Sequence, residues 1–162
     1  MGMKTVAIIG ALDEEVALIA KSLTHVTHTA KGSLDIVSGT VDSFGSDVIK
    51  VAATVGGMGL VNAAATTQLL IDEIAPDAVI FSGIAGNLNT HLHINDVVLG
   101  GTLRYLDTDM RLVGQFKPGT ADRPIEEYHS DDRLLELADQ ALNDLNIHHI
   151  VLSLIHISEP TR

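Results

Sequence analysis

The sequence has no cysteine and no tryptophan, and aromatic residues make up only 3% of its 162 residues. Without cysteine the chain can form no disulfide, no thiolate nucleophile and no Cys-ligated metal site, which favours an intracellular protein. No apolar run is long enough to span a bilayer, and the first residues, MGMKTVAIIG, enter a β-rich run without the apolar segment of a signal peptide. We therefore expect a cytoplasmic protein with an aliphatic core and no membrane partner.

Basic residues are also scarce, because 10 Lys and Arg stand against 21 Asp and Glu, for a formal net charge of −11. A nucleic-acid-binding surface needs clustered Lys and Arg, so nucleic acid is not an expected partner. The glycines at 56–59 lack the Gly-Lys-Ser/Thr of a phosphate loop. They also fail as a dinucleotide fingerprint, because Asn62 stands where a third glycine is needed.

Short aliphatic runs alternate with helical patterns along the chain. Strands are predicted at 4–10, 34–41, 47–55, 77–86 (including a glycine-rich exit after residue 82), 96–106 and from 148, and helices at 13–23, 60–74 and 131–145. The runs 34–41 and 47–55 should form a hairpin, and 107–130 should be a long loop. This order predicts an α/β fold, a three-layer αβα sandwich around a mixed β-sheet.

The end of the chain departs from this pattern. The strand that begins at 148 should end at 152, and the last ten residues, SLIHISEPTR, resemble translated adapter sequence. We therefore interpret residues 1–152 as the N-terminal part of a single domain that is incomplete at its C-terminus, and 153–162 as a non-native tail.

Three acids, Asp13, Glu14 and Glu15, follow the first predicted strand. At about 100° per helical residue, Glu15 lies only about 60° from the inward stripe that Leu12 and Val16 define, whereas the other two acids face outward. A favourable helix dipole explains the outward pair. A helix N-terminus lowers a carboxyl pKa and burial raises it, so the sequence leaves open whether Glu15 is an ionised group that orients or deprotonates water.

Glycine-rich segments follow two other predicted strands, as TVGGMGLVNAAATT (54–67) and FSGIAGNLN (81–89). Ligands of open α/β sheets bind beyond the carboxyl ends of strands, so the strand ends after residues 10, 55 and 82 should converge on one site. There Gly83 and Gly86 would let a flat ligand lie against the main chain. The alternative for 56–59 is a tight turn with close helix packing.

Two residue spacings resemble those of metal sites but are weak evidence for one. His91 and His93, and also Asp107 and Asp109, have no further ligands at useful positions, so we expect no metal and no cofactor. The neighbours His148 and His149 would point to opposite faces of a strand and could not share a ligand.

Four segments taken in order, IIGALDEEV, GGMGLVNAAATTQLLI, PDAVIFSGIAGNL and INDVVLGGTLRYLDTDM, resemble the methylthioadenosine/adenosylhomocysteine nucleosidases. These belong to the purine nucleoside phosphorylase superfamily, and the resemblance covers residues 4 to about 150. It implies a nucleoside phosphorylase-like fold that hydrolyses the N-glycosidic bond of both nucleosides. Adenine is released and water is the nucleophile. It also implies a homodimer in the full-length protein.

By the same resemblance, Glu15 handles the attacking water, and an oxocarbenium-like transition state would gain from its charge. The pocket for sugar and base would be lined by Leu12, Met58, Ile84, Ala85 and Gly86. The region 103–116, with Tyr105, would cover the thioalkyl group from a partner protomer.

The sequence also departs from the family. Relatives often carry a small hydroxyl residue at Ile84 and a glycine at Asn87. Their Met-Glu pair that binds the ribose, and the aspartate that protonates adenine N7, lie beyond residue 150, so no residue here takes those roles. General acid catalysis is worth roughly 10²–10⁴-fold, so we expect this chain alone to be barely active or inactive.

Two alternatives stay open. A nucleoside phosphorylase would need an anion site, but Lys50 precedes its strand and Arg104 follows another, so neither stands beside the glycine loops. A non-catalytic nucleoside-binding module could use the same glycine-lined surface.

Overall fold

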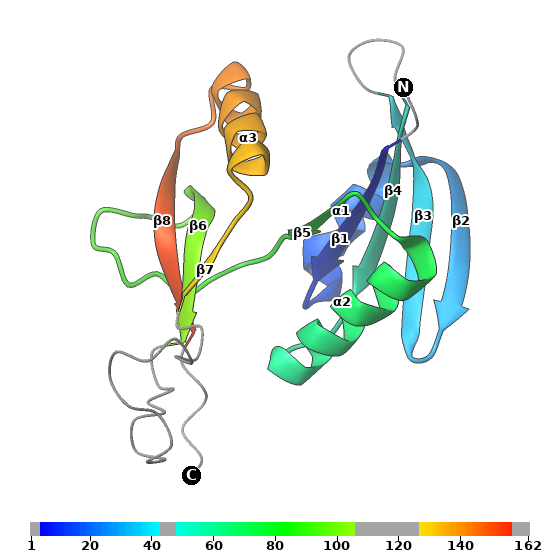
Figure 1. Cartoon of the computed structure of the whole chain (residues 1–162). Helices are drawn as coiled ribbons and strands as arrows, with labels where there is room; N and C mark the ends of the chain where they lie inside the picture. The colour runs from blue at the N-terminus through cyan, green and yellow to red at the C-terminus, as the bar shows by residue number, and fades with distance from the viewer. Residues whose placement is uncertain (1–3, 43–47, 106–126, 157–162) are drawn as a thin grey trace, which may run out of the picture. The chain divides into compact units, whose positions relative to one another are not determined.

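The computed structural model describes residues 4–42, 48–105 and 127–156, which form two compact units, Met1–Gly86 and Asn87–Arg162 (Figure 1). The first unit contains a five-stranded sheet in the order β2-β3-β4-β1-β5. Its elements are β1 (Lys4–Gly10), α1 (Asp13–Ser22), β2 (Thr24–Lys31), β3 (Leu34–Asp42), β4 (Val48–Val55), α2 (Leu60–Ile74) and β5 (Ala78–Phe81).

The sheet is mixed. β1 pairs in parallel with β4 on one side and with β5 on the other, so that Gly10 lies opposite Val55 and Ile9 opposite Phe81. β3 pairs antiparallel with β4 and with β2. The carboxyl ends of the three parallel strands therefore lie next to one another at one edge of the sheet.

Helices cover both faces of this sheet, which gives the three layers predicted from the sequence (Figure 1). Alternate residues of the strands and Leu70 of α2 form a buried aliphatic cluster: Ala7, Ile9, Ile36, Ala52 and Leu70. On the opposite face of the sheet, Val16 of α1 is buried and packs close to the backbone of Gly10. The core is aliphatic, as the shortage of aromatic residues required.

The predicted elements of this unit are largely confirmed. The predicted hairpin is β3 and β4, and both helices match within one residue of their predicted ends. The sequence analysis missed β2, because its residues, THVTHTAK, are almost all exposed and show no apolar alternation. β5 ends at Phe81, one residue before the predicted strand end after residue 82, and the predicted glycine-rich exit up to residue 86 lies in a loop.

The second unit contains a three-stranded sheet in the order β7-β6-β8. Its elements are β6 (Val97–Tyr105), β7 (Glu127–His129), α3 (Asp132–Asp144) and β8 (His149–His156). Asp131 caps α3, because its side chain accepts a hydrogen bond from the Leu134 N–H at 3.0 Å. β6 runs parallel to β8 and antiparallel to β7.

Two boundaries in this unit differ from the prediction. β8 continues to His156, four residues past the predicted end at 152, because Ser153 and Leu154 keep pairing with β6 and Leu154 fills the space over Gly100. The short strand β7 lies inside the predicted loop 107–130; of that loop, residues 107–126 lie outside the described residues. A non-native origin for 153–162 stays a prediction. Within the described ranges, no helix is long and apolar enough to cross a bilayer.

Candidate active site

Three chain segments leave the sheet side by side at the carboxyl ends of β1, β4 and β5. The Gly56 N–H donates to the Gly10 carbonyl at 2.9 Å, and the Ser82 N–H donates to the Ile9 carbonyl at 3.0 Å. The loops that follow β4 and β5 therefore both start against the end of β1. This confirms the predicted convergence of the three strand ends.

The Glu15 carboxylate lies in this convergence and accepts three backbone hydrogen bonds. Oε2 accepts from the Ala11 N–H at 2.6 Å and from the Leu12 N–H at 2.9 Å. Oε1 accepts from the Ile84 N–H at 2.9 Å, although Ile84 is 69 positions further along the chain. One side chain thus joins the start of α1 to the loop after β5.

The local part of this arrangement follows from the position of Glu15 in the third residue of α1. The residue before the helix, Leu12, has an extended backbone and no side-chain acceptor for the first amides of the helix. Glu15, at the third position, reaches back to the amides of Ala11 and Leu12 just before the helix, and its bond to the Leu12 amide is one half of a capping box. Because Glu15 is only partly buried, its carboxylate keeps some access to solvent.

These contacts decide the ionisation that the sequence left open. The hydrogen bond from the Ile84 amide is the largest cause that lowers the pKa of Glu15 below its ordinary value, and the Leu12 and Ala11 amides lower it further. Burial opposes them and is outweighed. Glu15 is therefore a carboxylate at neutral pH, suited to accept a proton rather than to donate one.

Two glycines make room for this side chain. A Cβ at Gly83 would lie 2.7 Å from Glu15 Oε1, and a Cβ at Gly10 would lie 2.6 Å from a methyl group of Val16 and 3.1 Å from the Glu15 Cβ. We expected Gly83 to leave space for a flat ligand, and this is wrong, because the Glu15 carboxylate fills that space. At Gly86 the space is open, because no atom of the described residues, apart from its chain neighbours, lies within 4 Å of a Cβ placed there.

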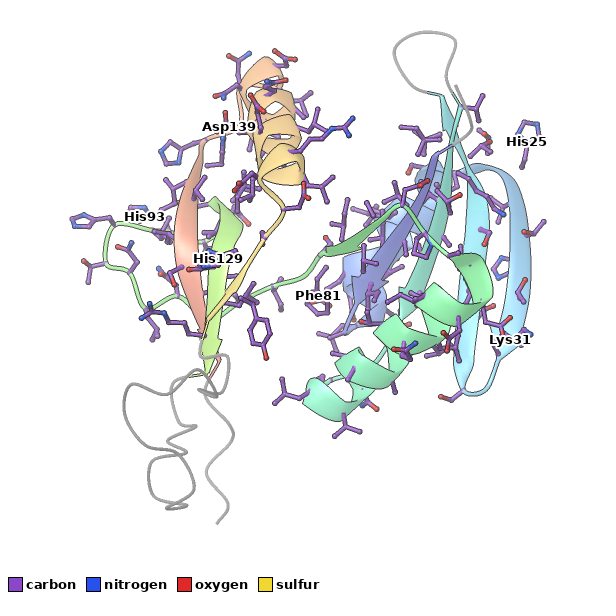
Figure 2. All side chains as sticks on the ribbon, in the orientation of Figure 1. His25, Lys31, Phe81, His93, His129 and Asp139 are labelled. Carbon is purple, nitrogen blue, oxygen red and sulfur yellow. The ribbon has the colours of Figure 1, made fainter. Side chains whose placement is uncertain are left out.

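The predicted pocket residues in the loops after β4 and β5 are exposed. Met58 and Ile84 are 72% and 83% exposed, and Ala85 and Gly86 are exposed as well. Leu12 contacts Glu15 through its backbone amide. Phe81, which the sequence analysis did not select, ends β5 with 62% of its surface exposed (Figure 2).

The glycine loop after β4 also forms a tight turn, which the sequence analysis gave as the alternative explanation for its glycines. Gly57 and Gly59 have φ of 87° and 95°, a region that favours glycine, and Gly59 is the residue before α2. The Asn62 side-chain amide donates to the Met58 carbonyl at 2.7 Å and holds the turn. The loop therefore forms a tight turn and also lies beside the strand ends.

Two surface hollows of about 220 and 230 Å³ lie elsewhere in the first unit, over β2, β3 and β4. Thr27, Ser38 and Lys50 line both of them, and His25 and Lys31 lie toward opposite ends of β2 (Figure 2). Neither hollow is lined by Glu15 or by a predicted pocket residue. We place the site at Glu15, because its carboxylate lies where the ends of β1, β4 and β5 meet.

Among the described residues, no group of three or more His, Asp or Glu side chains could hold a metal ion. His93 Nδ1 is 3.7 Å from Asp96 Oδ2 and the His93 side chain is 81% exposed, while the backbone N–H of His91 donates to Asn89 Oδ1 at 3.0 Å. Asp107, Asp109 and most of the region 103–116 lie outside the described residues.

One polar pair in the second unit was missed by the sequence analysis. His149 is 7% exposed and its Nε2 lies 2.8 Å from Asp139 Oδ1, while its Nδ1 lies 2.9 Å from the Ile147 carbonyl. Both partners are acceptors, so the ring satisfies both only when both nitrogens carry protons. The hydrogen bond to Ile147, followed by that to Asp139, raises the pKa of His149.

The first unit thus defines the class of protein: an α/β sandwich with an ionised carboxylate at the joined ends of parallel strands. The chain belongs to the phosphorylase superfamily, whose family model matches residues 5–157.

Individual relatives are similar over most of this chain. A 5′-methylthioadenosine/S-adenosylhomocysteine nucleosidase from Lysinibacillus sphaericus is 33% identical over 150 residues, which is 93% of this chain and 63% of the relative. One of the same name from Halalkalibacterium halodurans is 32% identical over 145 residues, 90% of this chain and 60% of the relative. The chain therefore spans about three fifths of the length of these relatives.

Solved structures agree. The nucleosidase from Neisseria meningitidis, in complex with methylthio-immucillin-A, has a TM-score of 0.82 and 29% identity and covers 96% of this chain, which spans 65% of it. The nucleosidase from Colwellia psychrerythraea, in complex with adenine, has a TM-score of 0.82 and 26% identity. The match covers 99% of this chain and 64% of the Colwellia chain. These likenesses confirm the nucleoside phosphorylase-like fold, and the family model confirms the predicted superfamily.

Proposed function

We propose that the whole protein hydrolyses the N-glycosidic bond of 5′-methylthioadenosine and S-adenosylhomocysteine and releases adenine. The observation that carries this proposal is the Glu15 carboxylate, which is ionised and held by three amides where β1, β4 and β5 end. The names of the relatives, at 32% and 33% identity, support the choice of substrates.

The chemistry follows from an ionised carboxylate beside a nucleoside. The oxygen of a water molecule bonds to C1′ while the bond from C1′ to the adenine nitrogen breaks and its electron pair leaves with the base. Glu15 accepts the proton that the water loses, and its charge stabilises the oxocarbenium-like transition state. Adenine gains a proton as it leaves, from an acid that the proposal does not assign to any residue of this chain.

Exposed loops around Glu15 would bind the nucleoside in this proposal. Met58, Ile84, Ala85 and Gly86 lie in the two loops that start beside β1, and the open space over Gly86 is compatible with a flat base. Leu12 would contribute next to Glu15. The exposed apolar surface of Met58 and Ile84 supports contact with the flat base of the nucleoside.

A phosphorylase is the competing function in this superfamily. Neither the loop 56–59 nor the loop 82–86 contains a Lys or Arg that could bind a phosphate nucleophile. We therefore favour water over phosphate. A non-catalytic binding module is less favoured, because such a module has no need for an ionised carboxylate at the ligand site.

The proposal includes a cytoplasmic homodimer that acts in salvage of the methylthio group. The lack of cysteine supports a reducing compartment. Exposed apolar side chains on both helices, such as Leu18 at 78% and Val61 at 82%, support a subunit interface.

The test is adenine release from methylthioadenosine, measured for the 162-residue chain and for the longest reading frame that contains it. We expect activity, without added phosphate, from a product as long as the relatives, and little or none from this chain. Full activity of the 162-residue chain would show that the acid that protonates adenine does not lie outside this chain.

A further inference from the structure

Gly83 lies against the carboxylate of Glu15, and its backbone gives no reason of its own for a glycine. A Cβ there would lie 2.7 Å from Oε1, 2.9 Å from Cδ and 3.1 Å from Oε2 of Glu15. The φ of Gly83 is outside the left-handed region, unlike those of Gly57 and Gly59, so an alanine would fit the backbone. The three atoms nearest to such a Cβ all belong to the Glu15 carboxylate.

The two oxygens of Glu15 differ in how many donors they serve. A carboxylate has about four lone-pair positions, two on each oxygen. Among the described residues, Oε2 accepts from two amides, Ala11 and Leu12, and Oε1 accepts from one, Ile84. The remaining position is therefore on Oε1, the oxygen that rests against Gly83.

We infer that Gly83 is a positioning residue for the proposed hydrolysis, because the missing side chain lets Oε1 of Glu15 bind the Ile84 N–H and turn its open lone pair to water. The inference rests on the proposed function and deepens it. It assigns the proton of the attacking water to Oε1 and the helix-capping task to Oε2.

A methyl group at position 83 should separate these two tasks. The carboxylate must move away from the loop, so the Ile84 hydrogen bond lengthens while the two bonds to Oε2 at the start of α1 can persist. The Ile84 bond is the largest cause of the lowered pKa of Glu15, so its loss should raise that pKa. A misplaced base costs turnover more than binding, by about 10- to 100-fold for a shift of about 1 Å.

The experiment compares Gly83→Ala with the parent in the full-length protein. We expect kcat for methylthioadenosine to fall about 10- to 100-fold with KM changed much less, and the acid limb of the kcat profile to move to higher pH. In the Glu15→Gln background, Gly83→Ala should lower kcat by no more than about twofold, because a residue that acts only through Glu15 has nothing left to position. Multiplying effects in the double variant would overturn the inference.

Gly39→Ala is the matched control for a purely structural loss. A Cβ at Gly39 would lie 2.7 Å from the Thr24 carbonyl oxygen and 2.8 Å from the Leu23 Cβ, which is as crowded as Gly83 but involves no atom of Glu15. Gly39→Ala should lower stability and leave the acid limb of the kcat profile where it is in the parent. If both variants moved that limb equally, the role of Gly83 would be refuted.

A readout without turnover separates this inference from the proposed function. Titration of the Glu15 side-chain carboxyl by ¹³C NMR should show its pKa higher in Gly83→Ala than in the parent, whether or not the protein cleaves methylthioadenosine. A shifted pKa in a protein without nucleosidase activity would overturn only the proposed function. An unshifted pKa in an active protein would overturn only the inference.

Discussion

Glu15→Gln should weaken the first unit of the chain as well as its chemistry. Glutamine has the same shape but only one acceptor oxygen, which can serve either the pair of amides at Ala11 and Leu12 or the amide of Ile84. The better choice keeps the pair and turns the side-chain NH₂ toward the Ile84 N–H. One donor then loses its partner, and the two remaining bonds lose their charge assistance.

The magnitude follows from these three bonds. A hydrogen bond to a charged group contributes about 1.5–3 kcal/mol when it is buried. Ile84 is 83% exposed, so water replaces part of the lost bond, and we expect the free energy of unfolding to fall by about 1–2 kcal/mol at neutral pH. The folded state lowers the pKa of Glu15, so its stabilisation is present above the ordinary pKa and is lost as the pH falls through the folded one. The difference between variant and parent should therefore shrink in acid.

Urea unfolding at neutral and acidic pH measures this difference, with Glu14→Gln as the matched control. Glu14 is an exposed acid in the same first turn, and its side chain forms no hydrogen bond with any of the described residues. It should lose only a helix-dipole contribution of about 0.3–1 kcal/mol. Equal losses for the two variants at neutral pH, or a Glu15→Gln loss that does not depend on pH, would refute the three-amide arrangement.

Two further predictions concern packing and protonation. Leu70→Ala removes a fully buried side chain from the aliphatic cluster under α2 and should lower the free energy of unfolding by about 2–5 kcal/mol, measured by urea unfolding; a loss below about 1 kcal/mol would contradict the described core. The pKa of His149 is raised, so its stabilisation of the second unit should be complete below the ordinary histidine pKa and disappear as the pH rises through the raised one. Asp139→Asn should reduce that pH dependence in thermal unfolding, and an unchanged pH dependence would count against the pair.

Periodicity predicted the fold well where burial follows the pattern of the side chains. α2 was predicted with its observed ends because Leu60 to Ile74 is an alanine-rich helical run that stops before Pro76, and in the structure Ala75 ends the helix in the left-handed region. β2 could not be predicted, because an edge strand exposed on both faces needs no apolar alternation. β8 ran past its predicted end because pairing with β6 continues there.

The site was predictable only in part. Angular position along α1 identified Glu15 as the inward acid, and the glycine loops marked the strand ends. The hydrogen bond to Ile84 depends on tertiary structure that brings residues 69 positions apart together, so no local pattern contains it. The same carboxylate explains Gly83. From the sequence alone this glycine was interpreted as leaving space for a ligand, but the Glu15 carboxylate fills that space.

The identity of the sugar product tests the central claim most directly. A protein that contains this chain and matches the length of the relatives should be incubated with methylthioadenosine in ¹⁸O-labelled water that also contains phosphate, and the products analysed by mass spectrometry. An ionised Glu15 that directs water predicts adenine and free methylthioribose that carries one ¹⁸O atom from the solvent. Methylthioribose 1-phosphate as the product would show that phosphate is the nucleophile and would contradict the account.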